Sequence, residues 1–443
     1  MKNYQDKIVS VQDVLAMIKS DFKVAVGDAT VEPQGFMSAL HAIADRVKNV
    51  EVWTCLQMRS YPFMEDAKYR ENFKIKCLFM SKPTRDAAKL IDVSFAPTHL
   101  RHTARTICAQ GLPDIFISSC SMPNEKGEMS ISMSNIYSSS VLREMKKAGR
   151  PVVMEINKNM PFAYGDNIIS VDDVDYMVPV EFDLPQDYPA PVTEKDSIIG
   201  GYIAEYINDG DCLQIGIGGI PNSVTGFLAG KKNLGIHTEL LGDGIVELAQ
   251  KGIVNGSKKQ FLPGKIVTSI VLGTNKTYDF VNNNPDVYVM SCEKCNDPYT
   301  IAQNDNQVSI NTTLEVDLTG QACSESIGSR QFSGTGGQTD TTVGAQMSKG
   351  GKTFLALYST ANVKNPVTGE REEISKIVPQ LKPGAAVSLC RNDMMYLVTE
   401  YGAVNLRGLT VEERAKAIIS IAHPKYREWL TAEAKKLGLI LMD

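Results

Sequence analysis

Short apolar runs rich in β-branched residues alternate with amphipathic stretches along most of the chain. In the first half these runs include FKVAVG at 22–27, FKIKCLFM at 73–80 and PVVMEIN at 151–157. Later they include CLQIGIG at 212–218 and KIVTSIVLG at 265–273. Each run has the length of a strand, and helix-like stretches separate many of them. The alternation predicts open α/β layers with mainly parallel sheets.

A stretch without any period interrupts this pattern at residues 182–196, FDLPQDYPAPVTEKD. Its three prolines and its acidic residues are typical of a linker. We therefore expect two domains, an N-terminal domain over 1–190 and a C-terminal domain over 191–443.

The two expected domains open with a similar pattern. VAVGDATVEPQGFMSAL at 24–40 runs strand, glycine, turn, proline and helix, and LQIGIGGIPNSVTGFLAG at 213–230 does the same. The similarity predicts two related, Rossmann-like α/β units, although ordinary strand–turn–helix order also produces such a match.

Composition and charge narrow the classes of function. The 443 residues include 46 Lys and Arg and 51 Asp and Glu, which gives a formal net charge of -5. This balance offers no electrostatic basis for binding nucleic acid or an anionic membrane. The start of the chain lacks the unbroken apolar region of a signal peptide, and no stretch has the length of a membrane span. With nine scattered cysteines, these features predict a cytoplasmic protein with free thiols.

Several cofactor and catalytic motifs are incomplete or absent in this sequence. Cys292 and Cys295 form a lone CxxC without a second pair or histidines at ligand spacing, so we expect no metal. Pro221 replaces the third glycine of a dinucleotide fingerprint, which weakens an oxidoreductase interpretation. GGKT at 350–353 lacks the first glycine of a P-loop, and the chain contains no Gly-x-Ser-x-Gly elbow.

Two glycine-rich loops are candidate binding sites. GIGGIP at 216–221 follows an expected strand and precedes an expected helix, whose first N–H groups can bind an anion. SGTGGQTD at 333–340 has three glycines in four residues, and no clean helix pattern follows it at once. Because ordering such a loop costs entropy, close backbone contact with a ligand is a reason to keep it. A tight structural turn and a flexible surface loop remain the alternative interpretations.

Two glutamates lie beside expected strand ends. Glu239, in GIHTELLGDG, lies where a strand runs into a glycine turn, the sheet edge at which α/β proteins bind ligands. The pattern alone does not choose Glu239 over Asp243 or Glu247. Glu400 follows the apolar run MMYLV and needs a partner or solvent. A salt bridge between Glu400 and Arg407 would give this carboxylate a purely structural role.

Taken together, the ordered segments resemble the acetyl-CoA hydrolase/transferase family, a group of CoA-transferases. The 4-hydroxybutyrate and butyryl-CoA:acetate CoA-transferases look like the most similar subgroup, and the resemblance covers nearly the whole chain. The matching segments are SMPNEKGEMSIS (121–132), LQIGIGGIPNSV (213–224), GIHTELLGDG (235–244), VSINTTLEVDLTGQ (308–321), SGTGGQTD (333–340), SKIVPQLKPGAAVSLCRND (375–393), VTEYGAVNLRG (398–408) and IAHPKYREWL (421–430).

The resemblance implies a role for each candidate residue. Glu239 matches the family's nucleophilic glutamate. Residues that match an oxyanion-binding loop or polar support near this glutamate are Gly218, Gly219, Ile220, Asn311 and Glu400. Residues that match the loop accommodating coenzyme A are Gly334, Gly336, Gly337 and Gln338. Thr339, Thr341 and the SMPN segment depart from the family's usual residues, which leaves the acyl specificity open.

The resemblance also implies an activity, an acyl-CoA:carboxylate CoA transfer with butyryl-CoA or 4-hydroxybutyryl-CoA and acetate as partners. The reaction would be ping-pong, through an acyl-glutamyl anhydride and a glutamyl-CoA thioester. Coenzyme A would be a substrate and a covalent adduct, with no permanently bound cofactor, and the protein would be a homodimer or a higher homo-oligomer. An acyl-CoA hydrolase with the same site and a non-catalytic CoA-binding protein are the alternatives. Dependence on a carboxylate acceptor and the reactivity of Glu239 would separate the three.

Overall fold

The computed structural model describes residues 4–216, 218–364 and 368–441. The chain forms two compact units that are not continuous in sequence. The first comprises the chain up to Tyr188 together with His237–Val246 and Lys265–Asp297. The second comprises Pro189–Ile236, Glu247–Gly264 and the chain from Pro298 onward. The linear division at residue 190 remains a prediction about domains.

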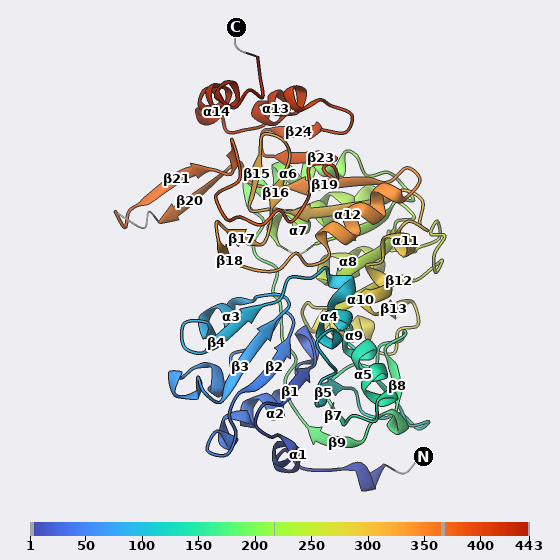
Figure 1. Ribbon diagram of the computed structural model, residues 1–443. Helices are drawn as coiled ribbons and strands as arrows, with labels where there is room; N and C mark the ends of the chain where they lie inside the picture. The colour runs from blue at the N-terminus through green and yellow to red at the C-terminus, as the bar shows by residue number, and fades with distance from the viewer. Residues whose placement is uncertain (1–3, 217, 365–367, 442–443) are drawn as a thin grey trace. The chain divides into compact units, whose positions relative to one another are not determined.

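A seven-stranded sheet forms the centre of the first unit (Figure 1). Its order is β4-β3-β2-β1-β5-β7-β9, and every neighbouring pair is parallel. The strands are β1 (Lys23–Val26), β2 (Val50–Thr54), β3 (Phe73–Cys77), β4 (Asp92–Phe95), β5 (Ile115–Cys120), β7 (Val152–Asn157) and β9 (Tyr176–Val180). Helix α1 (Val11–Met17) precedes β1, and the later helices are α2 (Gln34–Ala39), α3 (Lys82–Ala87), α4 (Thr103–Cys108) and α5 (Ser138–Lys147).

Burial explains why these apolar runs form a parallel sheet. All six residues of β5 and all six of β7 are buried, so both faces of the sheet are covered. Helices α1 and α2 add Val14, Leu15, Phe36 and Met37 to the same hydrophobic cluster as the strand residues. Burying one such side chain stabilises the fold by about 1.5–3 kcal/mol.

An eight-stranded sheet has the order β13-β12-β11-β10-β14-β19-β23-β24. Strand β10 pairs in parallel with β11 and β14, as do β12 with β13, β14 with β19 and β19 with β23, whereas β24 is antiparallel to β23. The strands are β10 (Cys212–Ile215), β11 (Gly235–Leu241), β12 (Ile266–Val271), β13 (Val287–Val289), β14 (Gln307–Thr312), β19 (Lys352–Ala356), β23 (Tyr396–Thr399) and β24 (Gly402–Asn405). Within β11 the chain passes from the second unit, at 235–236, into the first, at 237–241.

The remaining elements are helices and short strands. The helices are α6 (Glu194–Ala204), α7 (Gly219–Phe227), α8 (Asp243–Gln250), α9 (Asn275–Val281), α10 (Cys292–Cys295), α11 (Pro298–Ile301), α12 (Gln338–Met347), α13 (Val411–Ser420) and α14 (Pro424–Lys436). The short strands are β6 (Glu128–Ser130), β8 (Ile168–Ser170), β15 (Glu315–Asp317), β16 (Ala322–Cys323), β17 (Ser326–Ile327), β18 (Arg330–Gln331), β20 (Thr360–Lys364), β21 (Arg371–Ser375) and β22 (Ile377–Val378). Among the described helices, none combines the length and apolar character needed to cross a membrane.

The two large sheets share one strand order, which confirms the prediction of two related open α/β units. In each sheet the first four strands run outward in one direction, from β1 to β4 and from β10 to β13. The next strand, β5 or β14, pairs with the other side of the first strand. Sheets of this kind bind ligands at the carboxyl ends of the strands where the order reverses. The crevice expected in the eight-stranded sheet therefore lies at the ends of β10 and β14.

Candidate active site

Glu239 stands out within its own strand. Of the seven residues of β11, six are buried, and Glu239 alone is half-buried. The strand is held on its neighbour by the Thr268 hydroxyl, which donates to the Glu239 carbonyl oxygen at 3.3 Å. Because the residues on either side of Glu239 are buried, their packing fixes the direction of its side chain.

Asn296 holds the carboxylate of Glu239. The Asn296 amide Nδ2 donates to Glu239 Oε2 at 2.8 Å, and Asn296 is itself buried. Asn296 directly follows helix α10, whose last residue, Cys295, is tied to β11 twice. The His237 ring Nε2 lies 2.8 Å from the Cys295 carbonyl oxygen, and the Cys295 thiol donates to the Thr238 carbonyl oxygen at 3.5 Å. Three consecutive strand residues are therefore fastened to the end of α10.

Two buried thiols lie close enough to Glu239 for its charge to act on them. Burial raises the pKa of the Cys292 thiol well above its usual value, and the Glu239 charge raises it further. Burial likewise raises the pKa of Cys55, with the charges of Asp28 and Glu239 adding to the effect. The Cys292 thiol of the CxxC segment is therefore buried and protonated, and it does not offer a second nucleophile.

The structure separates Glu239 from the two acids that the pattern could not exclude. Asp243 accepts hydrogen bonds from the Thr274 backbone N–H and from the hydroxyls of Thr274 and Thr277. Although burial acts to raise the pKa of Asp243, these hydrogen bonds hold it below its ordinary value. Asp243 thus fastens helix α8 to the start of α9, while Glu247 is exposed on the same helix.

The first glycine-rich loop leads directly into helix α7. Ile217 lies outside the described residues, but Gly218 has a φ of 115°, which favours glycine, and the helix begins at Gly219 with Pro221 in its first turn. A Cβ at Gly219 would lie 2.7 Å from both carboxylate oxygens of Asp196. The loop therefore needs both glycines, one for its backbone angle and one for close approach.

The second glycine-rich loop is anchored at its end by Gln338. The Gln338 amide Nε2 donates to the Thr312 carbonyl oxygen at 2.8 Å, and the Gln338 Oε1 accepts from the Ser324 hydroxyl at 2.7 Å. The expectation that no helix follows at once was wrong, because α12 begins at Gln338. The helix is polar and packs by close approach, since a Cβ at Gly344 would lie 2.7 Å from Ile301 Cβ.

Asn311 lies on β14, one residue before the strand ends, at the expected crevice. Its Nδ2 donates to the hydroxyls of Ser309 at 3.0 Å and Thr341 at 3.2 Å, and to Gln214 Oε1 at 3.5 Å. This polar cluster links β10, β14 and α12 in the second unit.

Glu400 directly follows β23 and is strongly anchored. Its carboxylate forms an ion pair with Lys195 at 2.8 Å and accepts from the Ser359 N–H at 2.8 Å and hydroxyl at 2.9 Å. Burial acts to raise the pKa of Glu400, but these donors together hold it below its usual value. The suggested salt bridge between Glu400 and Arg407 is wrong, because the Arg407 guanidinium donates to Gln346 Oε1 at 2.6 Å instead.

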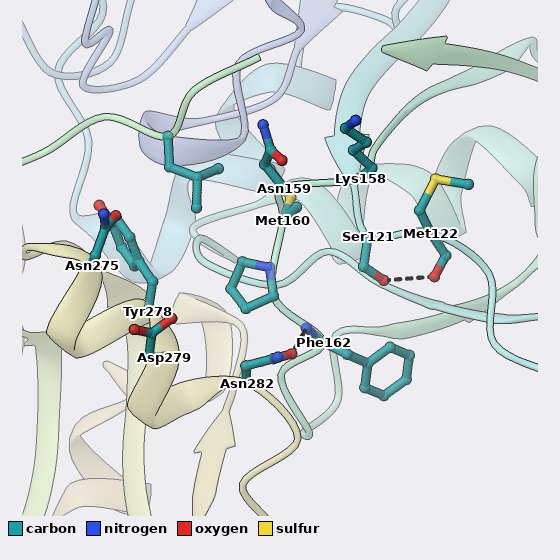
Figure 2. A pocket seen from close by; sticks show the side chains of 12 residues that line it. Ser121, Met122, Lys158, Asn159, Met160, Phe162, Asn275, Tyr278, Asp279 and Asn282 are labelled. Carbon is teal, nitrogen blue, oxygen red and sulfur yellow. Dashed lines mark hydrogen bonds between the residues drawn. The ribbon is translucent and has the colours of Figure 1, made fainter. Parts of the chain in front are cut away.

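A polar hollow of about 440 Å³ opens in the first unit (Figure 2). Ser121 and Met122 line it after β5, residues 158–162 line it after β7, and Asn275 and Tyr278 line it from α9. None of its lining residues is a predicted site residue. Within the described part of the chain, no group of three or more His, Cys, Asp or Glu side chains could hold a metal ion.

The predicted residues fall into two sets. Glu239 lies in the first unit. In the second unit, Gly218–Ile220, Asn311 and Glu400 lie at or near the ends of parallel strands, and the 334–338 loop follows the antiparallel hairpin of β17 and β18. Their roles remain predictions. Sequence reasoning missed the contact between Asn296 and Glu239. The one signal for Asn296 in the sequence was its position directly after the CxxC segment.

Comparisons with known proteins agree on one family. The model of the acetyl-CoA hydrolase/transferase N-terminal domain matches residues 1–183, and that of the C-terminal domain matches residues 273–434.

The similar proteins extend over the whole chain. The 4-hydroxybutyrate coenzyme A transferase of Clostridium kluyveri is 40% identical over 434 residues, 98% of each chain. The succinyl-CoA:cyclohexane-1-carboxylate CoA transferase of Geobacter metallireducens is 39% identical and covers 99% of this chain and 97% of its own. The crystal structure of a 4-hydroxybutyrate CoA-transferase from Porphyromonas gingivalis matches with a TM-score of 0.78 and 34% identity, over 98% of both chains.

Proposed function

The chain belongs to the acetyl-CoA hydrolase/transferase family and is an enzyme of the CoA-transferase type, and from this premise we propose its reaction and its nucleophile. It transfers coenzyme A from an acyl-CoA to a free carboxylate through a covalent thioester on Glu239. The observation that carries the proposal is the Glu239 carboxylate itself, half-buried in a buried strand and held by Asn296.

The reaction proceeds in two mirror-image halves. The ionised Glu239 attacks the thioester carbonyl carbon, the C–S bond breaks, and coenzyme A leaves as thiolate from a mixed acyl-glutamyl anhydride. The thiolate then attacks the glutamyl carbonyl, which releases the first carboxylate and leaves a glutamyl-CoA thioester. The incoming carboxylate attacks this thioester and runs the steps in reverse. No net proton transfer is needed in either half.

Each tetrahedral step places negative charge on a former carbonyl oxygen. Backbone N–H groups at Gly218, Gly219 and Ile220 are our candidates for stabilising it, because helix α7 begins there. One well-placed donor is worth about 3–4 kcal/mol in the transition state. Asn296 contributes differently, since its hydrogen bond to Oε2 limits the directions in which the carboxylate can point.

The second glycine-rich loop is assigned to coenzyme A. Gly334, Gly336 and Gly337 leave its backbone free of side chains, and Gln338 ties its end to β14. Binding energy from the pantetheine and nucleotide parts of the substrate can offset the high energy of the anhydride. Asn311 and Glu400 are assigned as polar support at the ends of the neighbouring strands.

We propose butyryl-CoA or 4-hydroxybutyryl-CoA as the acyl donor and acetate as the acceptor. The support is the name of the Clostridium kluyveri relative, which acts on 4-hydroxybutyrate. The Geobacter metallireducens relative acts on a ring carboxylate, so the acyl group is the part of the proposal that has to be measured first.

Intact and peptide mass spectrometry tests the mechanism. The protein is mixed with butyryl-CoA and no acceptor, and the peptide that carries Glu239 is expected to gain coenzyme A. Acetate should then remove the adduct and form acetyl-CoA. E239A should bind coenzyme A, keep its melting temperature and form no adduct.

Three results would contradict the proposal. Steady release of free coenzyme A without an adduct and without an acceptor would identify an acyl-CoA hydrolase at the same site. An adduct on another peptide, or normal turnover by E239A, would remove Glu239 as the nucleophile.

We also propose that the protein is a homodimer, on the strength of the family resemblance. One chain has a mass of 48.5 kDa. Sedimentation equilibrium should give about twice this mass, and a single species at the mass of one chain would contradict the dimer.

A further inference from the structure

Glu325 is a buried carboxylate at the base of the second glycine-rich loop. It directly precedes β17, and the hairpin of β17 and β18 returns the chain to the same point. There the Glu325 carbonyl oxygen accepts the backbone N–H groups of Phe332 at 2.8 Å and Ser333 at 3.0 Å. The glycine-rich loop begins at Ser333, so Glu325 is the residue from which the loop departs.

The Glu325 side chain then reaches into the loop itself. Its Oε2 accepts the hydroxyl of Thr335 at 2.6 Å and that of Ser388 at 2.7 Å, and its Oε1 accepts Gln331 Nε2 at 3.4 Å. Thr335 stands between Gly334 and Gly336, the loop's most adaptable positions. Ser388 also ties down the far end, because its carbonyl oxygen accepts the Thr339 hydroxyl at 2.7 Å.

The choice of a carboxylate here has a chemical reason. Glu325 is 5% exposed, and among the described residues no lysine, arginine or histidine forms an ion pair with it. Burying a charge without a cation is unfavourable unless hydrogen bonds satisfy it. All three side-chain partners are donors, and only a carboxylate presents acceptors on both oxygens without a hydrogen of its own.

We infer that Glu325 is a positioning residue that holds the glycine-rich loop in the conformation that binds coenzyme A. The inference rests on the proposed role of this loop in the transfer reaction. Without the two hydroxyl contacts, a loop with three glycines samples many conformations, and binding has to order it each time. The predicted effect is therefore on coenzyme A affinity, and not on the chemistry at Glu239.

The test measures the dissociation constant of free coenzyme A by titration calorimetry, in wild type, E325Q and T335V. Glutamine keeps the size of the side chain but turns an N–H₂ group toward donors. We expect E325Q and T335V each to weaken binding by about tenfold, or about 1.4 kcal/mol. The double variant should bind no more weakly than E325Q, since both changes break the same contact.

A second readout separates positioning from general loss of structure. In a ping-pong enzyme the KM for acyl-CoA should rise with the dissociation constant, while the KM for the carboxylate acceptor stays within twofold of wild type. E315Q is the matched control, because Glu315 is another buried carboxylate of the same unit, and its contacts are to Lys382. E315Q should lower the melting temperature and leave coenzyme A binding unchanged.

Wild-type coenzyme A affinity in folded E325Q and T335V would overturn the inference, and so would equal weakening by E315Q. If E325Q does not fold, T335V alone decides by the same criterion. The proposed function fails separately. A wild type that binds coenzyme A in a Glu325-dependent way but transfers it to no carboxylate would sustain this inference and refute the transferase reaction.

Discussion

The Glu239 carboxylate shows how a single side chain is prepared for chemistry. Its neighbours in β11 are buried, so the strand cannot turn without moving apolar residues out of the core. Asn296 then fixes the carboxylate from a different part of the chain, at the end of α10. A nucleophile placed in this way loses little freedom when the substrate binds.

Replacing Asn296 tests this arrangement. We expect N296A to lower kcat by about 10- to 100-fold, because one hydrogen bond to a charged group is worth about 1.5–3 kcal/mol. The KM for acyl-CoA should change little, since Asn296 contacts the nucleophile. Stopped-flow measurement of the first half-reaction checks this. N282A, in a helix-end asparagine of the same unit, is the control and should react normally, and a wild-type rate in N296A would contradict the role.

Glu155 illustrates a buried carboxylate with a purely structural task. It lies on β7, and its oxygens accept the backbone N–H groups of Gly35 at 3.0 Å and Phe36 at 2.6 Å, at the start of α2. Burial raises the pKa of Glu155 to about 7, against the lowering effect of these two hydrogen bonds.

The raised pKa predicts a pH dependence of stability. The folded state holds a proton on Glu155 between pH 4.5 and pH 7, whereas the unfolded chain releases it. The resulting stability is fully present below pH 4.5 and is lost as the pH rises through 7. Relative to E155Q, the free energy of unfolding of wild type should fall by up to about 3 kcal/mol over this range. Denaturant titrations at several pH values check this, and parallel curves for the two proteins would contradict it.

At the scale of elements, helix α12 connects the glycine-rich loop to the body of the second unit. The helix begins where the loop ends, and Gly344 allows it to approach α11 closely. Any displacement of α12 moves Gln338 and hence the anchor between the loop and β14.

A methyl group at Gly344 should therefore act at a distance. We expect G344A to lower the free energy of unfolding by about 1–3 kcal/mol, because it overpacks the contact with Ile301. It should also weaken coenzyme A binding, which calorimetry measures.

Gly226 provides the matched comparison within a helix. No atom lies within 4 Å of a Cβ placed there, so G226A replaces the second glycine of α7 without a clash. It should stabilise the protein by about 0.5–1 kcal/mol. If G344A behaved like G226A, the close approach of α11 and α12 would have no energetic importance.

At the scale of the whole molecule, the two large sheets repeat one strand order, and each reverses that order beside its first strand. Of the candidate residues in the second unit, Gly218–Ile220, Asn311 and Glu400 lie where β10, β14 and β23 end, as expected for such sheets. The net charge of -5 is small for 443 residues, so we attribute substrate recognition to local groups rather than to a general field.

The two half-reactions predict the steady-state behaviour of the whole enzyme. Initial rates with butyryl-CoA and acetate both varied should give parallel double-reciprocal lines, because one product leaves before the second substrate binds. Isotope exchange between butyrate and butyryl-CoA should occur without acetate. Intersecting lines without such exchange would indicate direct transfer and would exclude the covalent intermediate.

Much of the fold followed from local pattern. Apolar runs rich in β-branched residues located most strands of the two large sheets, and their alternation with helices predicted parallel sheets, because both signals depend on residues close in sequence. Helix α12 escaped prediction for the same reason. Its residues QTDTTVGAQM carry no apolar stripe, and its stability comes from packing that is visible only after folding.

By itself, the sequence determined the α/β class, the family and Glu239 as candidate nucleophile, the last two through motifs in a fixed order. Only the tertiary structure decided what holds the candidate residues. Asn296 is 57 positions from Glu239, Glu400 pairs with Lys195 rather than with Arg407, and Glu325 closes onto Thr335 and Ser388. The local pattern indicates which residues a strand or helix buries. Hydrogen-bond partners, in contrast, depend on which segments far apart in sequence the fold brings together.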